Sequence, residues 1–380
     1  MKKLLLVLIF VLFLFPCKVF ALDLLENGDT GILIEANSGK ILFEKEKDKR
    51  VSVASMTKMV AQIIIFEELE KGSISLEDIV TVSHNASSMG GSQIYLETGE
   101  KISVLDLIKG ISVASGNDAT VAMAEYISGT EEKFVERMNS TVKKMGLKNT
   151  HFKNCTGLDE EDHYSSSYDV ALIARELVLK HPDILKYSSI YEDYLRQNTE
   201  NKFWLVNTNK LIHFYDGADG LKTGHTDNAG YCLAATAKRG DLRLIGIVLG
   251  EKDSKVRNQE MMELLDYGFN TIKMNCLMQK DSVVDTKNID LAFPNTISIV
   301  LKDNLCVVEE KEDTSNYQFQ VELNHLDFPI RKGDVIGKIN VLENHSVVST
   351  QSLTVLEDIT RIKLFEFVKK TFVNFIYGIF

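Results

Sequence analysis

The sequence predicts an α+β fold: an antiparallel sheet with helices packed on it, then a small domain of strands and a terminal helix. Three observations predict it. Residues 22–52 alternate apolar and polar side chains as strands do, and residues 198–250 return to that pattern after a long stretch of helical periodicity. Residues 276–355 carry only short strand-like segments between polar turns. If the early and late strands pair, one sheet gathers both ends of the first domain.

Length and charge narrow the class of protein. The chain has 380 residues, which is long for one hydrophobic core and favours two domains. The formal net charge of -11 argues against nucleic acid as a partner, because a nucleic-acid-binding domain usually carries a basic surface.

Residues 1–21 have the three parts of a secretory signal peptide. Lys2 and Lys3 precede an apolar run over residues 4–15, Pro16 ends that run, and Ala21 supplies a small residue for cleavage. The run is short for a membrane span, although an uncleaved anchor is the alternative. We therefore expect an exported protein at the outer face of the cytoplasmic membrane.

The remaining cysteines do not suggest a disulfide framework or a metal site. Cys155, Cys232, Cys276 and Cys306 form no CxxC pair, and a chain of this length does not need covalent staples. We expect four unpaired, buried thiols. Because the sequence contains neither HExxH nor a Cys/His cluster with zinc spacing, we expect no metal and no organic cofactor.

The first domain is predicted over residues 22–275. The run Ala36-Asn37-Ser38-Gly39 marks a turn between two strands, and a helix over 55–71 ends at Gly72. Apolar residues at helical spacing then predict helices, and a strand–turn–strand and a last helix follow. The helical strings are VLDLIKGISVAS, ATVAMAEYISG and EEKFVERMNSTVKKMG, the paired strands are GYCLAATAKRGDLRLIGIVLG, and the last helix is KVRNQEMMELLDYGFNTI.

After the second domain, residues 356–380 are predicted to form an amphipathic helix. One face would be apolar and rich in aromatic side chains, and the other would carry charge; the apolar face holds Phe365, Val368, Phe372, Phe375, Ile376 and Ile379, and the polar face holds Lys363, Glu366, Lys370 and Asn374. This pattern is typical of a helix lying in a membrane surface, so we expect peripheral membrane attachment. A helix docked on its own protein is the alternative.

A candidate nucleophile begins the helix predicted over 55–71. Ser55 and Lys58 are three residues apart and share a helix face. A serine hydroxyl is a weak nucleophile that needs a base, and a lysine can be that base if burial or a neighbouring cation lowers its pKa. The helix N-terminus would favour an oxyanion at the serine.

Two further motifs make a catalytic role for this pair more specific as a prediction. Ser115-Gly116-Asn117 lies between two predicted helices, and Lys222-Thr223-Gly224 lies just before a strand. Ser-x-x-Lys, Ser-x-Asn and Lys-Thr-Gly in this order form the motif set of penicillin-recognising serine acyl enzymes. Two decoys exist: Ser140 and Lys143 form a second SxxK with no Ser-x-Asn before Lys222, and Ser83-His84-Asn85 is an alternative Ser-x-Asn.

With these motifs, the sequence closely resembles the D-alanyl-D-alanine carboxypeptidases, the low-molecular-mass penicillin-binding proteins. The resemblance covers essentially the whole chain and includes VASMTK, ISVASGNDA, GLKNTHF, YSSSYDVALIA and DGLKTGHTDNAGY. It implies a β-lactamase/transpeptidase-like catalytic domain. It also implies release of the terminal D-Ala from peptidoglycan stem peptides ending in D-Ala-D-Ala, with β-lactam antibiotics as covalent inhibitors.

The resemblance also implies a role for each motif residue. Ser55 would attack the penultimate D-Ala carbonyl, Lys58 would take its proton, and Ser115 would relay a proton to the leaving amine. Asn117 would hold the substrate peptide and help to position Lys58. Lys222 and Thr223 would bind the terminal carboxylate of the substrate. The backbone N–H groups of Ser55 and of His225, which follows Gly224, would form an oxyanion hole. We expect Lys222 to lower the pKa of Lys58 by charge repulsion.

Other interpretations of the same residues stay open. A β-lactamase shares the acylation step, but class A enzymes need a glutamate and its water for fast deacylation; Glu160 and Glu161 are available but lack the expected asparagine partner. A transpeptidase, an endopeptidase or a non-catalytic wall-binding scaffold could carry the same motifs. Singly, Ser115-Gly116-Asn117 could be a plain turn and Lys222-Thr223-Gly224 a hairpin edge, with His225 a polar edge residue.

Overall fold

The computed structural model describes residues 24–197, 199–289, 292–312, 315–362 and 368. The predicted signal peptide and residues 363–367 and 369–380 of the predicted terminal helix therefore lie outside the described residues. Among the residues that are described, no helix combines the length and apolar character needed to cross a bilayer.

The first domain is built on a five-stranded antiparallel sheet in the order β2-β1-β9-β8-β7. As predicted, strands from the two ends of the domain pair, with Thr30 opposite Leu249 and Glu35 opposite Leu244. β1, β8 and β9 are almost wholly buried, because helices cover both faces of the sheet. The strand bounds are β1 Thr30–Glu35, β2 Ile41–Lys45, β7 Ala218–Thr226, β8 Gly230–Arg239 and β9 Leu242–Glu251.

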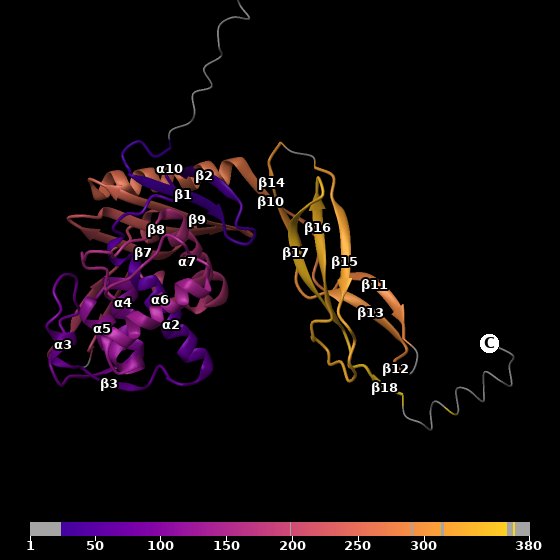
Figure 1. Cartoon of the computed structure of the whole chain (residues 1–380), viewed down its shortest axis with the longest axis horizontal. Helices are drawn as coiled ribbons and strands as arrows, with labels where there is room; N and C mark the ends of the chain where they lie inside the picture. Colours follow the sequence, from indigo (N-terminus) through magenta and orange to yellow (C-terminus); the bar gives the residue numbers. More distant parts are fainter. Residues whose placement is uncertain (1–23, 198, 290–291, 313–314, 363–367, 369–380) are drawn as a thin grey trace, which may run out of the picture.

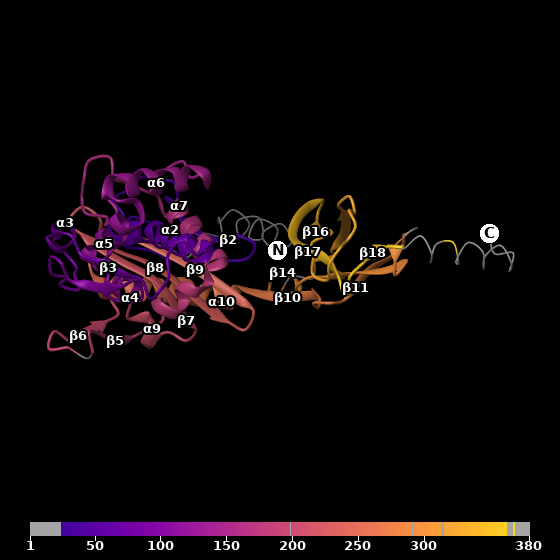
Figure 2. The same cartoon turned by 90° about the horizontal axis from the view of Figure 1, so that it is seen from below.

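Figures 1 and 2 show α10 on one face of this sheet and the other long helices on the opposite face. The predicted helical strings all form helices here: α2 Lys58–Lys71, α4 Val104–Ala114, α5 Asn117–Ser128, α6 Glu131–Lys144 and α10 Ser254–Thr271. A further long helix, α7 Ser167–Lys180, was not predicted. Shorter elements connect them: β3 Ile79–Thr81, α3 His84–Ser87, β4 Lys101–Ser103, η2 Pro182–Ile184, α8 Leu185–Ser188, β5 Glu192–Leu195, β6 Phe203–Val206 and α9 Leu211–Phe214.

The start of α2 differs from the prediction in a way that matters for the site. Gly72 ends the helix in the left-handed conformation, as predicted, but Ala54–Thr57 form a 3₁₀ turn, η1, before α2. In a 3₁₀ turn, side chains at i and i+3 eclipse one another. This tighter turn therefore keeps Ser55 and Lys58 on one side of the chain although Ser55 is not in the α-helix.

The second domain is a small β structure with its own apolar core. Its main sheet has the order β11-β13-β17-β16-β15, and its buried residues include Ile299, Leu305, Ile339 and Leu353. A two-stranded ladder of β10 and β14 follows directly from α10 and leads into this domain (Figure 1). The strands are β10 Ile272–Met278, β11 Val283–Asn288, β12 Ala292–Phe293, β13 Thr296–Leu301, β14 Leu305–Glu310, β15 Gln318–Leu323, β16 Gly337–Glu343, β17 Ser346–Val355 and β18 Thr360–Arg361.

The predicted helix of residues 356–380 does not begin at 356. Residues 356–362 are not helical: Ile359 is fully buried in the second domain and pairs with Ile330, and β18 follows it. An apolar side chain that completes the β core cannot also lie on the face of a membrane helix. Beyond residue 362 only Val368 is described, so the rest of that prediction lies outside the described residues.

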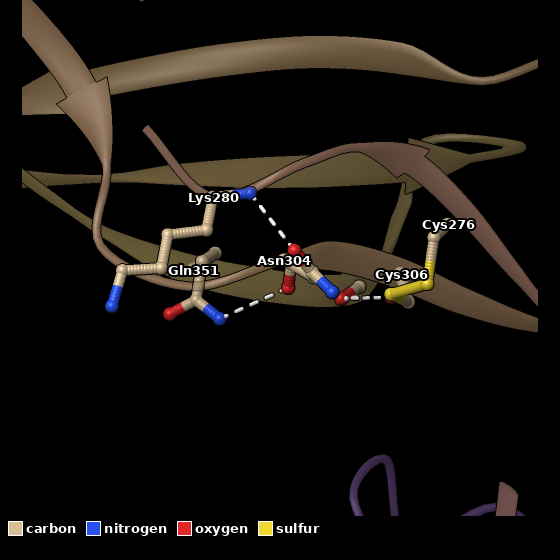
Figure 3. The surroundings of a disulfide bond; sticks show 6 residues. Cys276, Lys280, Asn304, Cys306 and Gln351 are labelled. Atoms are coloured by element: carbon tan, nitrogen blue, oxygen red, sulfur yellow. Dashed lines mark hydrogen bonds between the residues drawn. A yellow bond between two sulfur atoms is a disulfide. The ribbon is translucent and has the colours of Figure 1, made fainter. Parts of the chain in front are cut away.

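The expectation of four unpaired cysteines is wrong for two of them. Cys276 and Cys306 lie directly opposite one another in the β10–β14 ladder and form a disulfide (Figure 3). Their partnership follows from strand register, which a separation of 30 residues does not reveal. Cys155 and Cys232 are free and buried, as expected.

Thiol titration in denaturant checks this pairing. In protein lacking residues 1–21, two thiols should react before reduction and four after it. Reduction should also lower the free energy of unfolding of the second domain by about 3 kcal/mol, because the cross-link restricts the unfolded chain. The Cys276→Ser/Cys306→Ser double variant is the matched control. Reduction should change neither its number of reactive thiols nor its free energy of unfolding. Four reactive thiols before reduction would contradict the structure.

Candidate active site

Ser55 lies in the η1 turn, at the point where the chain enters α2. Its side chain is half-buried, and the residue before it, Ala54, has a φ of 46°. A left-handed conformation is costly for a residue with a Cβ, and such strain persists only where surrounding contacts impose it. The turn that carries Ser55 is therefore held in place by its neighbours.

Lys58 places its ammonium nitrogen against the Ser55 hydroxyl. Nζ lies 2.9 Å from Ser55 Oγ, 2.6 Å from Asn117 Oδ1 and 2.6 Å from the carbonyl oxygen of Thr156. The side chain is 0% exposed. Burial lowers the pKa of Lys58 to about 7, although the nearby Asp118 opposes this. Burial, one of the two predicted causes, therefore accounts for the shift, and the predicted repulsion from Lys222 is not among its causes.

The loop after α6 supplies the Thr156 carbonyl. Asn154 Oδ1 accepts hydrogen bonds from the N–H groups of Thr156 and Gly157 and from the Thr156 hydroxyl, which fixes the loop in a tight turn. Gly157 packs directly under η1, because a Cβ there would lie 1.9 Å from the Ala54 carbonyl oxygen. Only glycine allows this approach of two backbones.

Ser115 and Asn117 lie in the turn between α4 and α5. Ser115 is buried with a φ of 61° and ends α4, and Asn117 begins α5. The Asn117 amide donates from Nδ2 to the Gly90 carbonyl at 2.7 Å, which turns its Oδ1 towards Lys58. Of the two Ser-x-Asn motifs, this one therefore meets the Ser55–Lys58 pair.

The decoy motifs have structural roles elsewhere. Ser83 caps α3 by accepting from the Ala86 N–H, and Asn85 donates to Glu125. Ser140 and Lys143 are both exposed on α6. Neither motif contributes a hydrogen bond to Lys58.

The Lys-Thr-Gly segment lies on β7, the edge strand of the sheet, beside η1. A Cβ on Gly224 would lie 2.9 Å from the Ser55 backbone nitrogen and 3.0 Å from Ala54 Cβ, so glycine permits the strand to approach the nucleophile. The Thr223 hydroxyl donates to Thr208 Oγ1 at 2.7 Å. The His225 side chain is exposed, and its ring lies tilted against that of Tyr231.

Lys222 is a second buried lysine in the same site. Its Nζ donates to the Thr223 carbonyl at 2.6 Å. Burial lowers the pKa of Lys222 well below its usual value, and the positive charges of Lys58 and Arg257 lower it further. The two lysines are therefore near enough for the charge of Lys58 to disfavour that of Lys222.

Four residues of the site escape sequence reasoning. Thr156 acts through a backbone carbonyl, which any residue could supply, and Thr208 contacts Thr223 from a connecting segment. Thr57 and His163 hydrogen-bond to each other at 2.8 Å beneath η1. The string EEDHYSSS contains His163, but in the sequence only its two glutamates were considered as catalytic residues. Both glutamates are exposed.

A serine hydroxyl hydrogen-bonded to a buried lysine, beside a strand and a turn that carry further polar groups, is typical of serine hydrolases. The sequence profile described as D-alanyl-D-alanine carboxypeptidase matches residues 26–253, and that of the penicillin-binding protein 5 C-terminal domain matches residues 273–361. The chain belongs to the D-alanyl-D-alanine carboxypeptidase family.

Similar proteins extend over both domains. The chain is 42% identical to D-alanyl-D-alanine carboxypeptidase DacF of Bacillus subtilis, over 92% of this chain and 90% of that protein. Penicillin-binding protein 5 of Haemophilus influenzae has a similar structure, with a TM-score of 0.70, 32% identity, and coverage of 88% of this chain and 98% of that one. Penicillin-binding protein D2 of Listeria monocytogenes in an ampicillin-bound form has a TM-score of 0.58 and 29% identity, covering 64% of this chain and 97% of that one.

Burial of Lys58 should make stability depend on pH. The pKa of Lys58 is about 7 when folded and about 10.4 in an unfolded chain. The unfolded state therefore binds the extra proton between these values, so this lysine lowers stability most below pH 7 and progressively less towards pH 10. The free energy of unfolding of Lys58→Met, taken relative to that of the wild type, should thus be higher at pH 6 than at pH 10. The change in this difference should be a few kcal/mol.

Urea unfolding followed by circular dichroism at both pH values measures this difference. Lys143→Met, which removes an exposed lysine, is the control and should show no such change with pH. The packing contacts that Lys58→Met breaks are lost at pH 6 and at pH 10 alike. They therefore cancel when the stability differences at the two pH values are compared. A constant difference between wild type and Lys58→Met would contradict the lowered pKa.

Proposed function

We propose that the chain is a serine-type D-alanyl-D-alanine carboxypeptidase that removes the terminal D-Ala from peptidoglycan stem peptides through an acyl-enzyme on Ser55. The observation that carries this proposal is the contact of 2.9 Å between Ser55 Oγ and the buried Lys58 Nζ, next to Asn117 and the Lys222–Gly224 strand. The family to which the chain belongs supports the same reaction.

Two of the Lys58 partners decide how the amine can act as a base. Asn117 Oδ1 and the Thr156 carbonyl can only accept, so each takes one N–H of Lys58. In the neutral amine, the nitrogen lone pair is then left facing Ser55 Oγ. The serine proton passes to Nζ as Oγ attacks the carbonyl of the penultimate D-Ala.

The tetrahedral oxyanion would be held by the backbone N–H groups of Ser55 and His225. As the scissile bond breaks, the leaving D-Ala amine takes a proton that Ser115 relays from Lys58. Water then attacks the acyl ester, returning the proton to the enzyme and freeing the shortened peptide.

Lys222 and Thr223 would bind the free carboxylate of the terminal D-Ala. A cation beside a hydroxyl suits this group, and β7 presents both next to Ser55. An incoming carboxylate would also favour the charged form of Lys222, which burial otherwise disfavours. Recognition of a free acid end separates a carboxypeptidase from an enzyme that cleaves within a peptide.

The loop facing Lys58 argues against rapid β-lactam hydrolysis. Glu160 and Glu161 are exposed, and the loop presents the carbonyl of Thr156, not a carboxylate, to the lysine. A carbonyl cannot activate water as a general base. We infer that β-lactams, which acylate the same serine, are covalent inhibitors rather than substrates, in keeping with the ampicillin-bound relative from Listeria.

The cellular setting is part of the same proposal. Residues 1–21 would direct export, and residues 22–275 would form the catalytic domain at the outer face of the cytoplasmic membrane. The β-rich domain, assigned to residues 276–355, would connect it to a membrane-surface helix further along the chain. Strands run from Ile272 to Arg361 in this part of the chain, which supports a β-rich domain there.

Ser55→Ala should abolish the proposed chemistry. We expect at least an about 10³-fold loss of D-Ala release and no covalent labelling by penicillin, because no other group can carry the acyl chain. Mass spectrometry of the wild type should place one penicilloyl group on Ser55 and show that it persists. Ser140→Ala, the exposed serine of the second SxxK, is the matched control and should be unchanged. Fast penicillin turnover would instead favour a β-lactamase.

The rate should rise with pH as Lys58 loses its proton. Because the base must be neutral and its pKa is about 7, kcat/KM for D-Ala release should increase through pH 7 and level off above it. In Lys58→Arg, whose side chain stays charged, kcat/KM should fall by about 10²–10⁴-fold. Initial rates from pH 5 to 9 measure the profile, and a rate that falls as pH rises through 7 would exclude Lys58 as the base.

A further inference from the structure

His163 makes a chain of hydrogen bonds that ends beside the nucleophile. The Lys153 N–H lies 3.2 Å from His163 Nδ1, His163 Nε2 lies 2.8 Å from Thr57 Oγ1, and Thr57 Oγ1 lies 2.9 Å from the Ala54 carbonyl oxygen. His163 is 6% exposed and Thr57 1% exposed. The chain thus links the loop after α6 to the residue before Ser55.

The direction of every hydrogen bond in this chain is determined. A backbone N–H can only donate, so Nδ1 accepts from Lys153 and carries no proton. The neutral ring therefore bears its proton on Nε2 and donates to Thr57, while the single hydroxyl proton of Thr57 goes to the Ala54 carbonyl, which cannot donate. One tautomer alone satisfies all three contacts.

The chain of hydrogen bonds ends at Ala54, the residue of the site with a strained backbone. Ala54 holds a φ of 46° immediately before Ser55, and its carbonyl is pressed against Gly157. A hydrogen bond from Thr57 to this carbonyl fixes the peptide plane that joins Ala54 to Ser55. That peptide plane includes the Ser55 N–H, so its orientation sets the direction of the Ser55 backbone donor, the proposed oxyanion-hole group next to the nucleophile.

We propose that His163 is a positioning residue for acylation, which acts through Thr57 to hold the Ala54–Ser55 peptide in its reactive orientation. It touches neither substrate nor the reacting atoms. This inference rests on the proposed function, because it concerns the same serine and the same reaction.

The surroundings of His163 keep its ring neutral. Burial lowers the pKa of His163 to about 4, the charges of Lys58 and His151 lower it as well, and Asp159 and Glu160 oppose this. Phe152 covers the ring, with centroids 5.4 Å apart. A proton on Nδ1 would have to displace the Lys153 N–H, so the neutral tautomer persists throughout the working pH range.

Two pairs of variants separate the hydrogen bonds from the packing. Thr57→Val and His163→Phe keep the side-chain shape but remove the bonds, whereas Thr57→Ser keeps the hydroxyl and His163→Gln keeps a donor near the position of Nε2. We expect Thr57→Val and His163→Phe each to lose at least about tenfold in penicillin acylation rate and in kcat for D-Ala release, with KM changed less than about twofold. Thr57→Ser and His163→Gln should recover most of the loss.

A double-mutant cycle tests that the two residues act as one unit. The Thr57→Val/His163→Phe double variant should lose no more than the worse single variant, because either change already breaks the chain. His151→Gln is the matched control: His151 lies in the same loop but bonds to the Asp162 carbonyl instead, so its rates should equal wild type.

The results can contradict this inference without touching the proposed function. Equal acylation rates in Thr57→Val and Thr57→Ser, or losses that multiply in the double variant, would overturn it. ¹⁵N NMR of the wild-type imidazole adds a measurement that needs no variant: a proton on Nδ1 at pH 7 would also overturn it. If wild-type protein neither releases D-Ala nor acquires penicillin on Ser55, the proposed function itself has failed.

Discussion

The site depends on one electrostatic constraint: an amine buried among oxygen atoms. Lys58 is removed from water, which would normally expel its charge, yet three oxygens lie within 2.9 Å of Nζ. Burial brings its pKa to about 7, where the amine can both take and return a proton.

Three segments distant in sequence meet at the Ser55–Lys58 pair. The α4–α5 turn brings Asn117 to the amine, the loop after α6 brings the Thr156 carbonyl, and β7 packs against the backbone of Ser55. Close backbone approach recurs among these contacts. Gly157 and Gly224 each stand where a Cβ would overlap the η1 turn, so their lack of a side chain is a packing requirement.

The second domain illustrates what a pattern of short strands can and cannot reveal. Alternating residues predict β structure after α10 correctly, and in β14 buried residues alternate with more exposed ones. They do not reveal which strands pair, and hence neither the Cys276–Cys306 disulfide nor the bridge from Ile330 to Ile359 was foreseen. Ile359 lay within the range predicted as an amphipathic helix, although it was not among the residues assigned to the apolar face.

The sequence by itself determined the α+β class, the strand and helix segments, and the three motifs, because periodicity and residue chemistry are local properties. It also identified Ser55 and Lys58 as a pair, since a spacing of three suits either an α-helix or the 3₁₀ turn that is present. The sequence favoured Ser115 over Ser83, but only the tertiary structure showed Asn117 bonded to Lys58 and Ser83 capping α3, and only it placed Thr156 and His163 beside the site. Those choices depend on burial and on backbone groups from distant segments, and neither leaves a signature in residue spacing.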